Sequence, residues 1–159
     1  MNKPDLSGIS VLVDGGCLNN NQSVSERRMY GSLVVLKDGK PVASTYNGNQ
    51  EVIHRFDIMP VGERVTNNAA ELVMIRTALK YVRQLIERHC KPLDILIVSD
   101  SEWALKLVTG AYKLGNKTAV EYHNFLTDIK WDKAHLESAG CTILFQHVAN
   151  EWVKSVLGH

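Results

Sequence analysis

The sequence predicts an α/β fold, in which a mixed sheet with an antiparallel front edge is flanked by helices. Two observations predict it. In the second half of the chain, short apolar runs alternate with long segments whose apolar residues recur at helical spacing. In the first half, two extended runs flank Lys37-Asp38-Gly39-Lys40, and an Asp-Gly pair in that position is typical of a β-hairpin.

Three strands are expected in the first half. The run from Ile9 to Val13 is apolar and rich in β-branched residues, and Asp14-Gly15-Gly16 predicts a turn directly after it. Met29 to Leu36 and Pro41 to Tyr46 are the predicted arms of the hairpin. The polar stretch 47–65 fits no element clearly, so we assign none to it.

The second half is expected to begin with a long helix. Its apolar residues recur every three or four positions from Ala69 to Ile86, and Thr66 or Asn67 is the expected N-cap. The other predicted elements are, in order, a strand from Leu93 to Val98, a helix from Glu102 to Thr109 capped by Ser101 and stopped by Gly110, a helix from Ala119 to Ser138, a strand from Thr142 to Val148 and a helix from Ala149 to Leu157.

Size and composition indicate one globular domain over residues 1–159. The content of 45% hydrophobic and 22% charged residues is that of a soluble protein with a single core. No apolar run approaches the ~20 residues of a membrane span, and the first ten residues lack the core of a signal peptide, so we expect a cytoplasmic protein. The three cysteines fit neither a disulfide framework nor a metal knuckle. Because the net charge is only +1, any site for a polyanion needs clustered cations.

Three acidic residues occupy special places in this plan. Asp14 and Asp100 each follow a predicted strand, and they emerge at the same sheet edge if the two strands are parallel neighbours. Glu71 lies in the first turns of the long helix, within reach of that edge. Hard divalent ions such as Mg²⁺ bind carboxylate oxygens and keep open positions for a substrate phosphate. The three acids therefore predict a site for metal-dependent phosphodiester hydrolysis.

Each acid alone also has a purely structural explanation. Asp-Gly is usually a turn, Asp-Ser is a common helix start, and a glutamate in the first turn of a helix suits the helix dipole. The prediction therefore depends on the three occurring together and in this order.

Three motifs surround the acids: Val13-Asp14-Gly15-Gly16-Cys17-Leu18 with Asn20, then Thr66-Asn67-Asn68-Ala69-Ala70-Glu71-Leu72, then Val98-Ser99-Asp100-Ser101. Together they resemble the acidic motifs of type 1 ribonucleases H, and the resemblance covers nearly the whole chain. It implies a five-stranded mixed sheet of the ribonuclease H-like fold, with its first three strands antiparallel. It also implies two Mg²⁺ ions, with Mn²⁺ as a possible substitute, and hydrolysis of the RNA strand of RNA/DNA hybrids to 5′-phosphate and 3′-hydroxyl ends by a monomer.

The resemblance also implies where a hybrid would bind. Amide side chains can both donate to and accept from a ribose 2′-hydroxyl, which suits Asn20, Asn67 and Asn68 for the minor groove. The motif residues Gly15 and Ser101 are further expected substrate contacts. Expected phosphate contacts are Lys113 and Lys117, in a segment that resembles the short connection of family members without a basic inserted helix, and also Arg27, Arg28, Arg55 and Arg64. Trp103 and Trp131 are expected to pack in the core.

The chain departs from the family pattern at its end. The family's fourth acid is an aspartate in the last helix, and this chain has no aspartate after Asp132. If Thr142 to Val148 is the last strand, then His159 falls close to the place of the missing acid, and an imidazole can ligate a divalent metal. In a competing alignment, Glu151-Trp152-Val153-Lys154 is the last strand and the final helix is missing. We favour the first alignment, which adds His159 to the expected catalytic and metal-binding residues.

Two alternatives to a hybrid-cutting ribonuclease remain open at this point. One is another nuclease of the same fold, such as a junction resolvase. The other is a nucleic-acid-binding module that grips hybrid but cuts it weakly or not at all, because it lacks the fourth acid.

Overall fold

The computed structural model describes residues 4–19, 21–60, 65–116, 118 and 120–158. Its elements are, in chain order, β1 (Ile9–Leu18), the short 3-10 helix η1 (Val24–Glu26), β2 (Arg28–Lys37), β3 (Lys40–Val42), β4 (Ser44–Tyr46), β5 (Asn49–Glu51), β6 (Ile53–Ile58), α1 (Asn67–His89), β7 (Asp94–Ser99), α2 (Glu102–Thr109), α3 (Val120–Ser138), β8 (Thr142–His147) and α4 (Asn150–Leu157).

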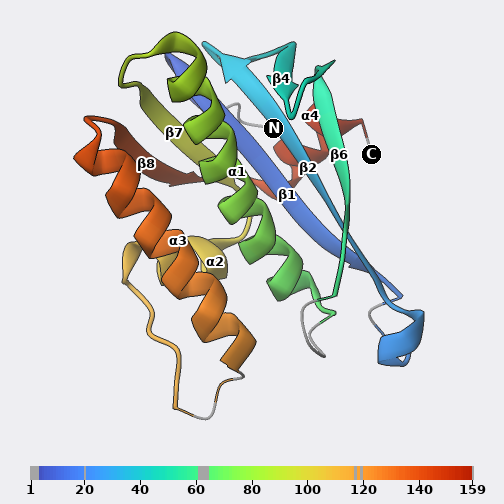
Figure 1. Cartoon of the computed structure of the whole chain (residues 1–159). Coiled ribbons are helices and arrows are strands. Elements are labelled where there is room, and N and C mark those ends of the chain that lie inside the picture. The colour runs from blue at the N-terminus through green and yellow to red at the C-terminus, as the bar shows by residue number, and fades with distance from the viewer. Residues whose placement is uncertain (1–3, 20, 61–64, 117, 119, 159) are drawn as a thin grey trace.

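A mixed sheet forms the centre of the molecule (Figure 1). The strand order is β3-β2-β1-β7-β8, and β6 pairs with β2 beyond the point where β3 ends. β3 and β6 therefore share one edge position, and the sheet is five positions wide. β1 pairs antiparallel with β2 and parallel with β7, which in turn pairs parallel with β8. This confirms the predicted α/β fold with an antiparallel front edge.

Helices cover both faces of the sheet. α1 and α3 lie in front of it in Figure 1, whereas α4 lies behind β1 and β2. Alternate side chains of β1 point to the two faces, as the period of a strand requires. Val11 and Val13 pack with α1, and Leu12 packs with Trp152 and Val153 of α4. The sheet is therefore buried on both sides where β1 crosses the middle of the molecule.

The predicted turn at Asp14-Gly15-Gly16 is wrong. β1 continues through these residues to Leu18 and pairs with β2 in unbroken antiparallel register. Gly16 lies opposite Tyr30, whose ring occupies the space where a Cβ would stand. The glycines are therefore used for close packing rather than for a change of chain direction.

The hairpin is confirmed at its turn and corrected beyond it. Asp38 and Gly39 have φ of 50° and 81°, the left-handed pair that a tight two-residue hairpin turn requires. The second arm, predicted from Pro41 to Tyr46, divides into β3 and β4. Stretch 47–65, which had no assignment, contains β5 and β6. β6 has polar residues at alternate positions because only part of it is covered, so its apolar signal is weak.

The remaining helices and strands lie where the sequence predicts them. Thr66 is the N-cap of α1, and its side chain accepts a hydrogen bond from Ala69 N at 3.0 Å. Ser101 caps α2 in the same way, and Gly110 ends it. The competing alignment, in which residues 151–154 form a strand, is wrong because they lie in α4.

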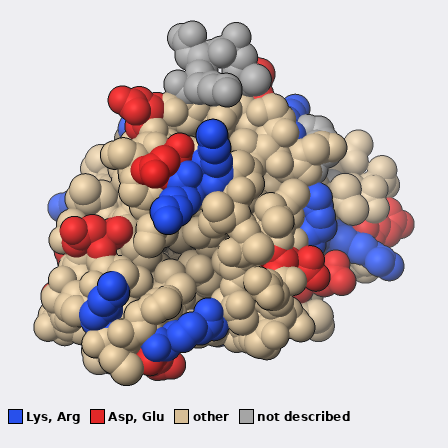
Figure 2. Space-filling model, turned by 90° about the horizontal axis from the view of Figure 1, so that it is seen from above, with Lys and Arg blue, Asp and Glu red and all other residues tan. Residues whose placement is uncertain are grey.

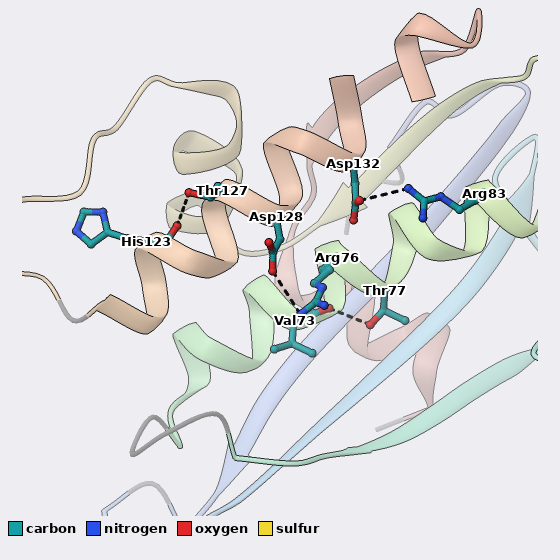
Figure 3. Close-up of polar contacts among 8 residues, drawn as sticks. All are labelled: Val73, Arg76, Thr77, Arg83, His123, Thr127, Asp128 and Asp132. Carbon is teal, nitrogen blue, oxygen red and sulfur yellow. Dashed lines mark hydrogen bonds and ion pairs between the residues drawn. The ribbon is translucent and has the colours of Figure 1, made fainter. Parts of the chain in front are cut away.

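Two ion pairs connect α1 with α3 (Figure 3). Arg76 lies 3.8 Å from Asp128, and Arg83 lies 3.4 Å from Asp132. Both pairs are partly exposed, so each contributes at most about 1 kcal/mol. Trp131, one residue before the second aspartate, is 63% exposed, so the expectation that it packs in the core is wrong. Trp103 does pack against the core, edge-on to the ring of Tyr122.

Gly15 allows α1 to approach β1 very closely. A Cβ at this position would lie 2.5 Å from the backbone C and O of Ala70 and 2.7 Å from the backbone N of Glu71. Real Cβ atoms do not approach backbone atoms this closely, and neither backbone is free to move because both are in the core. The separation of helix and sheet is therefore fixed by the absence of a side chain.

We expect Gly15→Ala to lower the free energy of unfolding by about 1–3 kcal/mol, because the added methyl group forces α1 away from β1. Chemical denaturation followed by circular dichroism measures this change. Gly115→Ala is the matched control, since its Cβ would meet only Thr118 Oγ1 at 3.7 Å. Equal stability of the two variants would contradict the packing argument.

Candidate metal centre

Asp14 and Asp100 meet because of the parallel register of β1 and β7. The paired residues run from Ile9 with Ile95 to Leu12 with Val98. Continuing this register by two residues brings Asp14 level with Asp100, directly after the end of β7. The expectation that the two strands are parallel neighbours is therefore confirmed. Both acids stand at the carboxyl end of β7, where ligand sites of α/β sheets commonly lie.

Glu71 comes to the same place from α1. It is the fifth residue of the helix, and the close approach at Gly15 brings its backbone against β1. The backbone amide of Gly15 also favours the ionised forms of Asp14 and Glu71, because it acts to lower the pKa of both carboxyl groups. Gly15 therefore serves the site twice, once by lacking a side chain and once through its amide.

The three carboxyl groups form one cluster. Each contributes an oxygen, and these oxygens lie within 4.8 Å of one another. Glu71 is only 8% exposed, whereas Asp14 and Asp100 are half-buried. The Oε2 atom of Glu71 is fully buried and has no hydrogen-bond partner in the described part of the chain. In the described ranges, these three residues form the single group of potential metal ligands.

Burial and mutual repulsion make this cluster hard to ionise. Burial, followed by the charges of Asp100 and Asp14, raises the pKa of Glu71 to about 9. The pKa of Asp14 is raised to about 6, chiefly by burial and then by the charge of Asp100. Both shifts follow from the cost of placing like charges together away from water. The same negative charges, after burial, raise the pKa of Tyr30.

This arrangement fits a hard divalent cation. Carboxylate oxygens are the ligands that Mg²⁺ and Mn²⁺ prefer, and the spacing of the oxygens lets one ion contact more than one carboxylate. A bound cation would also give the buried Oε2 of Glu71 a partner, whose absence otherwise costs free energy. Asp14, Glu71 and Asp100 could therefore hold a metal.

Sequence reasoning missed two neighbours of this cluster, Asn150 and His147. The Nδ2 of Asn150, the first residue of α4, donates to Asp100 Oδ2 at 2.6 Å. The ring Nε2 of His147, the last residue of β8, lies 3.2 Å from the backbone carbonyl oxygen of Asp100. The feature of the sequence that could have identified them is their position at the junction of the last strand and the last helix.

Tyr30 is a third neighbour that sequence reasoning missed. Its phenol ring lies over Gly16 on the strand beside Asp14, and its electrostatic interactions include all three acids. No motif in the sequence pointed to this tyrosine, because the contact depends on the pairing of β1 with β2.

Some of the residues expected to contact substrate are hydrogen-bonded within the protein, and others are exposed. Asn67 lies one helical turn before Glu71, and its Oδ1 accepts a hydrogen bond from the backbone N–H of Cys17 at 2.7 Å. Asn68 and Lys113 are exposed, and neither has a hydrogen bond or ion pair among those found in the described residues. Ser101 is occupied as the cap of α2. Asn20, Lys117 and His159 lie outside the described residues, as does Arg64.

The expected arginine contacts are scattered. Arg27 donates to the carbonyl oxygens of Gln22 and Val65, and Arg55 donates to that of Leu157. Arg28 is exposed at the start of β2. On the face in Figure 2, Lys and Arg side chains lie among Asp and Glu rather than in one extended patch. Charge alone therefore does not outline a path for a polyanion on that face.

No helix in the described ranges is long and apolar enough to cross a bilayer.

Comparison with known proteins finds similarity in structure and none in sequence families. No protein-family model matches it, and no curated protein sequence matches it. Among solved structures, ribonuclease H1 of the halophilic archaeon Halobacterium salinarum is similar, with a TM-score of 0.61 and 17% identity over 92% of this chain and 89% of that one. LC11 ribonuclease H1, isolated from compost by a metagenomic approach, has a TM-score of 0.63 and 17% identity over 96% and 92% of the two chains.

A second structure of LC11 ribonuclease H1, in complex with an RNA/DNA hybrid, matches with a TM-score of 0.58 and 20% identity over 91% of this chain and 87% of that one. At such identities the likeness defines the architecture. The order of the strands, the antiparallel front edge and the flanking helices agree with it. The chain therefore has the ribonuclease H-like fold, with a cluster of three acids at the carboxyl end of its parallel strands.

Proposed function

We propose that this protein is a metal-dependent endoribonuclease that hydrolyses the RNA strand of RNA/DNA hybrids and leaves 5′-phosphate and 3′-hydroxyl ends. The observation that carries the proposal is the cluster of Asp14, Glu71 and Asp100, whose oxygens lie within 4.8 Å at the end of two parallel strands. Three carboxyl groups so close together, one of them buried, are costly to ionise without a cation. The cost indicates that the cluster is maintained for binding one.

The substrate class rests on the motifs and on the fold. The three motifs that resemble type 1 ribonucleases H lie in the ribonuclease H-like fold, and one protein of that fold was crystallised with an RNA/DNA hybrid. The Asn67 carbonyl is held by Cys17 N, so its amide group is oriented and remains available as a donor. An oriented donor suits a ribose 2′-hydroxyl, the group that distinguishes RNA from DNA.

Divalent ions at this site, two in the mechanism that we propose, would neutralise the scissile phosphate and ease ionisation of the attacking water. The protein residues hold the ions and orient the attacking water. Asp14 and Asp100 supply carboxylates from adjacent strands, and Glu71 supplies one from the opposite side through α1. Because the Glu71 side chain is buried, it has little freedom to turn, and we assign it to hold an ion and orient the water.

We expect cleavage of RNA/DNA hybrid with Mg²⁺ or Mn²⁺, and no cleavage of double-stranded DNA, double-stranded RNA or a four-way junction. Labelled substrates resolved on denaturing gels measure this. Asp14→Asn should abolish cleavage yet retain hybrid binding in a gel-shift assay, because it removes a metal ligand and leaves the rest of the surface intact.

The other outcomes separate the alternatives. Binding of hybrid without cleavage under both metals would contradict the proposed enzymatic activity and favour a binding module. The presence of only three acids in the described cluster is also compatible with such a module. Cutting of the junction alone would favour a resolvase.

We expect Glu71→Gln to stabilise the metal-free protein progressively as the pH rises from about 5 to 9. The folded-state pKa of Glu71 is raised from 4.5 to about 9, so the folded state binds its proton more tightly than the unfolded state. This contribution to stability is complete below pH 4.5 and is lost as the pH rises to about 9. The glutamine does not titrate, so the variant avoids the loss.

Thermal unfolding in a chelator at pH 5, 7 and 9 measures the difference in melting temperature between the wild type and Glu71→Gln. In a separate measurement, adding Mg²⁺ at pH 8 should raise the melting temperature of the wild type more than that of the variant. The control is Glu87→Gln, an exposed residue of the same helix, which should show no such trend with pH. A melting-temperature difference that shrinks with rising pH would argue against a buried, repelling cluster.

We expect His159→Ala to lower cleavage at least tenfold, about 1.4 kcal/mol of activation barrier, with folding unchanged. The reason is that the cluster lacks a fourth acidic ligand among the described residues, and an imidazole can complete it. Single-turnover cleavage of hybrid and far-UV circular dichroism measure the two properties. Wild-type rates from this variant would refute the role.

A further inference from the structure

The junction of β8 and α4 makes three contacts with the end of β7. The backbone N–H of Val148 donates to Ser99 O at 3.0 Å. His147 Nε2 lies 3.2 Å from Asp100 O, and Asn150 Nδ2 donates to Asp100 Oδ2 at 2.6 Å. Of these contacts, only that of Asn150 reaches the side chain of Asp100. The first two position the backbone, and the third determines how the carboxylate is turned.

The side chain of Asn150 is not needed by its own helix. A helix usually begins with a residue whose side chain caps the free N–H groups. The N-cap of α4 is Ala149, which makes no side-chain capping bond, and Asn150 directs its amide to Asp100 instead. Capping needs a side-chain oxygen that accepts, so the Nδ2 donor of Asn150 has no part in capping and is directed to the acid cluster.

α4 is held firmly at both ends of its eight residues. Trp152, Val153 and Leu157 are buried against the back of the sheet. At the other end of the helix, the Arg55 guanidinium donates to Leu157 O at 3.2 Å, which satisfies a terminal carbonyl and connects α4 to β6. A helix fixed in this way places the amide of Asn150 reproducibly.

An amide donor at this place has a specific effect on a metal ligand. The Nδ2 group donates to Oδ2 of Asp100, and the carboxylate keeps further lone pairs for a cation. A hydrogen bond from a neutral donor to an ionised carboxylate is short and stronger than one between neutral groups. Unlike a further carboxylate, the amide adds no negative charge to a cluster that already contains three acids. It also limits rotation of the carboxylate before a metal arrives, which reduces the entropy lost on binding.

We propose that Asn150 is a positioning residue that holds the Asp100 carboxylate in its metal-binding orientation, so that the end of β8 and the start of α4 belong to the metal centre. This inference rests on the proposed metal-dependent function. It differs from that function in assigning a role to a neutral side chain that acts through Asp100.

The first test measures Mn²⁺ affinity by calorimetry, without any nucleic acid. Asn150→Ala should weaken Mn²⁺ binding about fivefold or more, whereas the control Asn124→Ala, which removes an exposed amide from α3, should leave it unchanged. Unchanged Mn²⁺ affinity in Asn150→Ala would overturn the proposal. If the wild type itself bound no Mn²⁺, the proposed function would fail as well, so the two failures are distinguishable.

The second test asks whether Asn150 acts through Asp100, and it uses the metal-free protein. A double-mutant cycle compares the effect of Asn150→Ala on the melting temperature in the wild type and in Asp100→Ala. We expect a larger loss of stability in the wild-type background than in Asp100→Ala, since the helix-start effect of the alanine is the same in both and cancels in the difference. Equal losses in the two backgrounds would show that the hydrogen bond contributes nothing and would overturn the proposal.

The third test separates positioning from substrate binding. In hydrolysis of RNA/DNA hybrid, Asn150→Ala should lower kcat at saturating Mg²⁺ about tenfold while KM for the hybrid changes less than twofold. A rise in KM with kcat unchanged would place Asn150 in contact with substrate and contradict the positioning role.

Discussion

The site depends on the contact between β1 and α1 at Gly15. Helix and strand backbones touch there, with no room for a Cβ between Gly15 and Ala70. This contact brings Glu71 close to Asp14, and the backbone of Gly15 favours the ionised form of both carboxyl groups. Packing and electrostatics are therefore coupled, because any side chain that separates helix from sheet also separates the acids.

The cluster that results is a compromise between function and stability. Three acids within 4.8 Å raise one another's cost of ionisation, and Glu71 has a buried oxygen without a hydrogen-bond partner among the described residues. Proteins commonly accept such local cost where a ligand offsets it. The surrounding structure is rigid enough to maintain it, since α1 is buried along one side of the sheet and α4 is fixed on the other. A firm scaffold keeps the carboxylates together before a cation binds.

Most of the secondary structure could be predicted because its signals are local. Helix caps at Thr66 and Ser101 use side chains a few residues from the groups they bind, so their pattern is visible in the sequence. The failures have a common cause. Gly15 and Gly16 resemble a turn locally, and only pairing with β2 makes them part of a strand. The alternating polar strand β6 and the exposed Trp131 likewise depend on what covers them.

The sequence by itself determined the order of the elements outside residues 41–65 and the identity of Asp14, Glu71 and Asp100, because these are properties of spacing and residue type. Tertiary structure decided that the three acids meet, through parallel register on one side and close helix packing on the other. It also decided that Asn150 lies against Asp100, a contact between residues fifty positions apart. Such a contact follows from how strands and helices pack in space, which no local pattern specifies.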